Sequence, residues 1–196
     1  GTAGTADGPG AGSAWDAVGP APLVVVDDAL PADGLAELRT LAAEQADAFV
    51  PARVGARHLL RPEHRNNLRL ETPEVAAVLD GWFAEVVRSL LGPVCDRLGL
   101  TRFAPALEEH RFCAYGDGTY FRAHADGPVD GSVGRLVSFA CFVHHEPRGF
   151  AGGDLLIHDY TGDGRWWEQR FTRIVPRANR LVLFPSAAFH QVATVH

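Results

Sequence analysis

The chain has no lysine and no methionine, so its 18 basic residues are all arginine. The absence of lysine excludes mechanisms that need an amine side chain, such as a Schiff base, a lysine general base or a phosphate-loop lysine. Arginine offers instead a permanent charge and a planar fork that grips a carboxylate through two hydrogen bonds. We therefore expect arginine to be the basic side chain that binds a carboxylate in this protein.

Cysteine, positive charge and long apolar runs are also scarce. The three cysteines, at positions 95, 113 and 141, lack metal-cluster spacing, so we expect buried free thiols in a reducing compartment and a cytoplasmic protein. The formal net charge is −6 and no run of arginines stands out, which argues against nucleic acid or an anionic membrane as a partner. No apolar run approaches the roughly 20 residues of a membrane-spanning helix.

The composition changes near residue 22. Residues 1–22 include 15 glycine, alanine or proline residues, and we expect a flexible lead-in because such a segment has little apolar surface to bury. Residues 23–196 are long enough to form one domain with its own core. Residues 51–70 are rich in arginine and histidine and lack a clear period, which is typical of a functional loop.

Helices come first in this domain and strands follow. One helix is expected from Asp33 to Phe49, and a second begins at Thr72 as N-cap with Pro73 at its first position and is bent or ended at Gly92-Pro93. Short β-branched or aromatic runs then alternate with turn residues, at 107–115, 135–143, 154–159, 170–175, 180–184 and 190–195. The pattern predicts an α+β, mainly β, fold with two helices covering one face of an antiparallel sandwich or barrel.

One stretch of the sequence contains candidate metal ligands. His124 and Asp126 are two residues apart at the end of a strand-like run, so their side chains are expected on one face. His190, which opens the last strand-like run, is the candidate third ligand. Two histidines and one carboxylate leave three positions open, which suits Fe(II), although cobalt, manganese or zinc fit the same ligands. The simpler alternative is that Asp126 only starts a turn before Gly127-Pro128.

Further motifs surround these residues in a fixed order. They are Tyr115–Phe121 (YGDGTYF), His124–Asp126 (HAD), Arg135–Phe139 (RLVSF), Gly152–Leu155 (GGDL), Pro176–Pro185 (PRANRLVLFP) and His190–Val192 (HQV). Taken together, this ordered set resembles the Fe(II)/2-oxoglutarate-dependent oxygenases of the prolyl-4-hydroxylase-like group. The resemblance covers residues 107–195, nearly half of the chain.

The resemblance implies a double-stranded β-helix, or jelly roll, with N-terminal helices packed against it. It also implies Fe(II) held by His124, Asp126 and His190, with 2-oxoglutarate as co-substrate. Tyr115 resembles a position that lines the 2-oxoglutarate pocket, and Tyr120 and Ser138 are weaker candidates for the same pocket. Tyr115 as an ordinary core tyrosine is an equal alternative.

In the family, a basic residue about ten positions after the second histidine holds the far carboxylate of 2-oxoglutarate. That position lies beyond His196, as does the last strand of the jelly roll, so the domain is expected to lack this strand. Arginines that could substitute are Arg111, Arg122, Arg135 and Arg180, each of which also has a structural or surface interpretation.

The expected reaction is hydroxylation of an amino-acid, peptidyl (including prolyl) or small natural-product substrate, with O₂ consumed and succinate and CO₂ released. Asp126 favours hydroxylation because related halogenating enzymes have a small residue there. Within the arginine-rich loop, Arg57 and His64 are candidate substrate contacts. The five arginines of the loop (53, 57, 61, 65 and 69) are expected either to meet an acidic substrate or to form a solvated face. The alternatives to an oxygenase are a non-catalytic jelly-roll metal-binding or sensor module and, less well supported, a zinc hydrolase.

Overall fold

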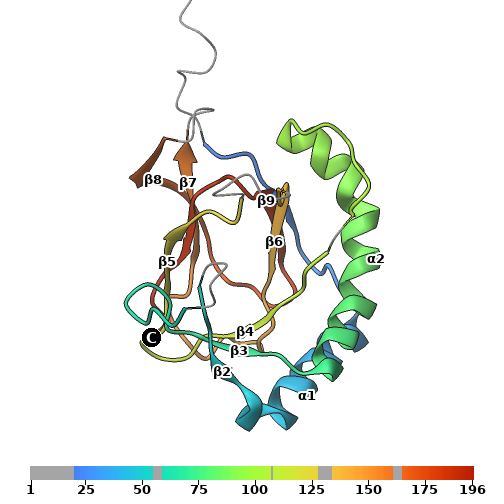
Figure 1. The fold of residues 1–196 in the computed structure, drawn as a ribbon. Helices are drawn as coiled ribbons and strands as arrows, with labels where there is room; N and C mark the ends of the chain where they lie inside the picture. The colour runs from blue at the N-terminus through green and yellow to red at the C-terminus, as the bar shows by residue number, and fades with distance from the viewer. Residues whose placement is uncertain (1–19, 55–58, 107, 128–133, 161–164) are drawn as a thin grey trace, which may run out of the picture.

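The computed structural model describes residues 20–54, 59–106, 108–127, 134–160 and 165–196, and these form ten strands in three antiparallel sheets (Figure 1). Sheet A contains, in spatial order, β5 (Phe121–His124), β10 (His190–Val192), β7 (Leu155–Tyr160) and β8 (Trp166–Ile174). Sheet B contains β1 (Val24–Val26), β9 (Leu181–Pro185) and β6 (Val137–Cys141). Sheet C contains β2 (Val50–Pro51), β3 (Leu68–Leu70) and β4 (Phe112–Ala114).

Sheets A and B pack face to face. Ile157 of β7 and Ile174 of β8 share one buried apolar cluster with Val182 and Phe184 of β9. The intervening residues of β9, including Leu183, point the other way, toward the helices. Every residue of β9 is therefore buried, and this strand is an unbroken apolar run rather than an alternating one.

Two helices cover the outer face of sheet B: α1 (Ala32–Glu44) and α2 (Pro73–Leu98), with a short 3₁₀ helix, η2 (Ala46–Ala48), after the first. The predicted N-cap is confirmed, since Thr72 Oγ1 accepts the Val75 N–H. The first helix was expected to reach Phe49 but ends at Glu44. None of the described helices has the length and apolarity needed to cross a membrane.

The second helix was expected to bend or end at Gly92-Pro93, and the expectation that it ends there was wrong. Helix α2 passes through Pro93 and continues to Leu98, where Gly99 at a φ of 70° terminates it. The extra turns bury Val94 and Leu98 in the cluster between the helices and sheet B. Burial of two large aliphatic side chains, worth roughly 1.5–3 kcal/mol each, offsets the hydrogen bond that a proline removes from a helix.

Each of the six runs predicted from residue 107 onward contains a strand, in the expected order, and β5 lies in the strand-like run before Asp126. Strand β8 begins earlier than predicted, at Trp166. The pieces β2 and β3, at either end of the arginine-rich segment 51–70, were not predicted. They pair with β4 to make sheet C, with Arg69 opposite Cys113. Of the expected lead-in, residues 1–19 lie outside the described part of the chain.

The side chain of Asn179 fastens the helical layer to the sheets. It accepts the Leu30 N–H through Oδ1 at 2.9 Å and donates from Nδ2 to the Leu30 carbonyl at 2.8 Å. Asn179 has a φ of 62°, a conformation that asparagine tolerates better than most residues. The chain entering α1 is thus held to the turn before β9.

Replacing Asn179 by alanine is expected to lower the free energy of unfolding by about 2–4 kcal/mol, because two buried backbone groups of Leu30 lose their partners and alanine is strained at positive φ. Urea unfolding followed by circular dichroism measures this. Asn179→Gly loses the same hydrogen bonds without the backbone strain and should be about 1 kcal/mol more stable than Asn179→Ala. An alanine variant as stable as the wild type would refute this role.

Candidate metal centre

The pairing of two strands brings the two candidate histidines together. Strand β10 lies antiparallel to β5 with His190 directly opposite His124, and the ring centroids are 4.2 Å apart. Asp126 follows β5, and both its backbone N–H and that of Gly127 donate to the Ser186 carbonyl at 2.9 Å. One ligand atom from each of the three side chains lies within 4.8 Å of the others.

Each imidazole is oriented so that Nε2 points to the common centre. His124 Nδ1 lies 2.9 Å from the Arg122 carbonyl oxygen, and His190 Nδ1 lies 3.0 Å from that of Ala188. Because a carbonyl only accepts, both Nδ1 atoms carry the proton and both Nε2 atoms keep a free lone pair. The two Nε2 atoms lie 3.7 and 3.6 Å from the oxygens of Asp126.

The environment sets the charges of these groups. Burial, together with the neighbouring His190, lowers the pKa of His124 to about 3. The pKa of His190 is also lowered, chiefly by burial. At Asp126 burial acts to raise the pKa, but the two histidines and the Ser138 hydroxyl outweigh it and the pKa is lowered. At neutral pH the cluster therefore holds two neutral imidazoles and one carboxylate.

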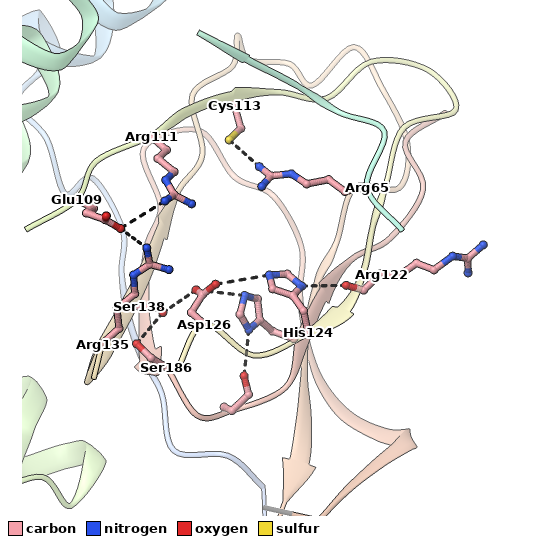
Figure 2. A network of polar contacts seen from close by, with 12 residues as sticks. Arg65, Glu109, Arg111, Cys113, Arg122, His124, Asp126, Arg135, Ser138 and Ser186 are labelled. Carbon is pink, nitrogen blue, oxygen red and sulfur yellow. Dashed lines mark hydrogen bonds and ion pairs between the residues drawn. The ribbon is translucent and has the colours of Figure 1, made fainter. Parts of the chain in front are cut away.

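The Ser138 hydroxyl holds the Asp126 carboxylate and is itself in contact with the Ser186 hydroxyl (Figure 2). Ser138 of β6 donates to Asp126 Oδ2 at 2.7 Å, and the Ser138 and Ser186 hydroxyl oxygens are 2.8 Å apart. Ser138 and Ser186 are buried. Sheet B thus orients a carboxylate that follows a strand of sheet A, and the donor set fits a divalent metal that accepts two imidazoles and one carboxylate.

Comparison with known proteins agrees with this geometry. Residues 110–196 match the model of the 2OG-Fe(II) oxygenase superfamily. That part of the chain is therefore similar to this superfamily. An uncharacterised PKHD-type hydroxylase of Synechocystis sp. (strain ATCC 27184 / PCC 6803 / Kazusa) is 25% identical over 135 residues. The match covers 68% of this chain but only 44% of that protein, so the chain spans less than half of its curated relative.

Solved structures of prolyl hydroxylases share the fold of this chain. A prolyl-4-hydroxylase of Pseudomonas putida has a TM-score of 0.63 at 22% identity, with 89% of this chain and 85% of that chain covered. A prolyl hydroxylase of Trichoplax adhaerens, in complex with a hypoxia inducible factor peptide fragment, has a TM-score of 0.67 at 20% identity, with 89% and 78% covered. The expected double-stranded β-helix with helices packed on one side is confirmed.

The three residues expected to line the 2-oxoglutarate pocket have different surroundings in the structure. Tyr115 lies near the centre, where burial raises its pKa and the charges of Arg65 and Asp126 both act on it. The Tyr120 hydroxyl donates to the Pro62 carbonyl at 3.1 Å and its ring faces Arg122, so its described side-chain contacts lie outside the cluster. Ser138 contacts Asp126 itself, and its expected contact with 2-oxoglutarate stays a prediction.

The fold brings part of the arginine-rich segment 51–70 to the candidate metal centre. His64 lies edge-on to Phe121 and His124, with ring centroids 5.7 and 6.3 Å away. Arg57 falls outside the described residues. The solvated-face interpretation is wrong for Arg65 and Arg69, which are only 7% and 9% exposed.

Sequence reasoning missed three contributors to the site. Ser186 was not singled out, and no local pattern marks it. Phe121 stacks on His124 with the ring centroids 3.6 Å apart. Arg65, which lies over the Phe121 ring at 4.3 Å, was considered only as one of five spaced arginines. The alternation of Arg65, Asn67 and Arg69 was the available signal, because it indicates an extended segment with these side chains on one face.

Replacing Ser138 by alanine is expected to raise the pKa of Asp126, because the carboxylate loses a hydrogen bond that favours its charged form. A carboxyl with a lowered pKa stabilises the fold at neutral pH, and that stabilisation is lost as the pH falls through the folded-state value. The variant should therefore be less stable at neutral pH, and the difference should shrink in acid. Carbon-13 NMR titration of metal-free protein measures the pKa, with the exposed Ser89→Ala as control. An unchanged Asp126 titration would contradict this.

Proposed function

We propose that this chain is the catalytic part of an Fe(II)- and 2-oxoglutarate-dependent dioxygenase that hydroxylates an amino-acid, peptidyl or small natural-product substrate. The observation that carries the proposal is the convergence of His124, Asp126 and His190, with both imidazoles neutral and turned Nε2-inward. Fe(II) bound there with 2-oxoglutarate supplies the chemistry in which O₂ and 2-oxoglutarate give succinate, CO₂ and a hydroxylated substrate. The three free cysteines support a cytoplasmic location.

The protein's own contribution is orientation and exclusion of water. The backbone carbonyls of Arg122 and Ala188 fix the two imidazoles, and Ser138 fixes the carboxylate, so little reorganisation is needed when a metal binds. Phe121 stacks on one imidazole, and Phe184 lies edge-on to the other at 4.7 Å. These rings keep water off one side of the cluster.

The substrate proposal draws on two supports. The Trichoplax adhaerens relative is in complex with a peptide, which makes a peptidyl prolyl group a reasonable candidate for this chain too. Position 126 carries a carboxylate, where related halogenating enzymes have a small residue, and this supports hydroxylation over halogenation. His64, beside His124, is the proposed substrate contact among the described residues of the arginine-rich segment.

Metal binding provides the first test. His124→Ala and Asp126→Ala are each expected to weaken Mn(II) binding at least 100-fold, because each removes one of three ligands, while His145→Ala, an exposed histidine, should bind like the wild type. Electron paramagnetic resonance of free Mn(II) measures the affinity, and circular dichroism checks the fold. Full affinity in both ligand variants would overturn the ligand assignment.

Turnover provides the second test. Wild-type protein with Fe(II) is expected to form succinate from 2-oxoglutarate only when O₂ is present, and Asp126→Ala should form at least 100-fold less. Liquid chromatography with mass spectrometry quantifies succinate, and the same assay without Fe(II) is the blank. A protein that binds the metal tightly but forms no succinate, even when extended beyond His196, would support the non-catalytic binding module instead.

A further inference from the structure

The three free cysteines have different surroundings. Cys95 is buried in α2, and Cys141 lies in β6, where burial raises the pKa of its thiol to about 12. Cys113 of β4 is partly exposed, and a guanidinium group donates to its sulfur, with Arg65 Nη2 lying 3.3 Å from Cys113 Sγ. The Cys113 thiol thus combines access from outside with a direct contact to a positive charge.

Arg65 is a buried cation whose other hydrogen bonds go to neutral groups. Its Nε donates to Asn67 Oδ1 at 2.7 Å, and a long contact of 3.5 Å joins its Nη1 to the Arg53 carbonyl. Arg65 is only 7% exposed, and within the described part of the chain no carboxylate pairs with it. Burying a guanidinium without a counter-ion is costly, so this arrangement favours a negative charge on the sulfur that Arg65 contacts.

Arg69 brings a second buried guanidinium to the same thiol. It is paired with Cys113 across β3 and β4, which sets the two side chains on one face of sheet C. Arg69 is 9% exposed, and although its Nη2 contacts Glu71, its Nε is buried with no hydrogen-bond partner among the described residues. Burial and the charge of Arg111 lower the pKa of Arg69, and negative charge at Cys113 and Glu109 opposes this. A thiolate at position 113 would therefore stabilise Arg69 as well.

The other charged groups around this face leave it positive. Arg111 and Arg135 share one carboxylate, that of Glu109. Together with the buried pair, four guanidinium groups thus have two carboxylate partners among the described residues, Glu71 and Glu109. Tyr115, which follows β4, adds no charge at neutral pH because burial raises its pKa. The thiol of Cys113 therefore lies in an electropositive and partly exposed environment, as reactive cysteines do.

We propose that Cys113 is a reactive thiol and a site of modification by electrophiles, with its thiolate held by Arg65 and Arg69. The thiolate is the nucleophilic form of cysteine, and neighbouring arginines favour it. With hydrogen peroxide the sulfur attacks one oxygen atom, so that an S–O bond forms, the O–O bond breaks and hydroxide leaves. The sulfur is oxidised by two electrons to a sulfenic acid, and the peroxide is the oxidant that is reduced.

The position of Cys113 connects such a modification to the candidate metal centre. The guanidinium that donates to Cys113 also lies over the Phe121 ring, which stacks on the ligand His124. Figure 2 shows Arg65 pointing to the sulfur of Cys113 on one side of Asp126 and His124. A group added to this sulfur would therefore disturb an arginine that is separated from a metal ligand by one aromatic ring.

Alkylation rates test the proposal on metal-free protein, so the result does not depend on the proposed function. Each cysteine lies in its own tryptic peptide, and mass spectrometry can follow iodoacetamide labelling of all three at neutral pH. Burial alone slows a thiol, whereas activation speeds it. Cys113 is therefore expected to react about three-fold or more faster in folded than in urea-unfolded protein, while Cys95 and Cys141 react more slowly when folded. An equal or lower rate for folded Cys113 overturns the proposal.

Two variants identify the source of the activation. Arg65→Gln is expected to lower the labelling rate of folded Cys113 about three-fold or more. Arg61→Gln replaces an arginine of the same segment whose side chain is 57% exposed, and it should leave that rate unchanged. If Arg65→Gln does not fold, the comparison of folded with unfolded wild type decides. A folded Arg65→Gln variant that labels like the wild type contradicts the proposal.

Hydrogen peroxide provides the second measurement. The wild type is treated with peroxide together with dimedone, which marks sulfenic acids, and the same three peptides are analysed. The adduct is expected on Cys113 and not on Cys141. An adduct on Cys141 instead, or none on any cysteine, overturns Cys113 as the site of modification and leaves the assignment of the metal ligands untouched.

Discussion

The register between β5 and β10 is the constraint on which the site depends. His124 and His190 are 66 positions apart in the chain, yet the antiparallel pairing sets them opposite each other. A slip of one residue would turn one imidazole to the other face of sheet A and separate the two rings. The pairing is held in turn by the apolar packing of β7 against β9, because β7 is the other neighbour of β10.

The third ligand shows how the two sheets cooperate. Asp126 lies beyond the end of β5, where no strand register fixes it, and its position comes from Ser186, whose carbonyl accepts two successive backbone N–H groups. Its carboxylate is then oriented by Ser138. Both serines belong to the sheet B side of the domain. The ligand set is therefore a product of the packing between the sheets, and loosening that packing would disorder the carboxylate before the histidines.

Sequence reasoning reached the parts of this protein that local chemistry determines. The N-cap at Thr72, the order of the strands and the three candidate ligands all followed from residue types at fixed spacings. It failed where distant packing decides: Pro93 stays in a helix because the residues after it are buried, and residues 68–70 become a strand because β4 lies beside them. Arg65 looked solvated for the same reason, since only the fold shows what covers it.

The composition of the chain and the character of its site are connected. Without lysine, every buried basic side chain in the described residues is an arginine or a histidine, and the two types lie in different parts of the site. The imidazoles beside Asp126 have lowered pKa values and stay neutral, as metal ligands must. Arginine side chains, in contrast, keep their charge even when they are buried. A lysine at position 65 could lose its proton on burial, because burial lowers the pKa of an amine. This part of the site would then lose a positive charge.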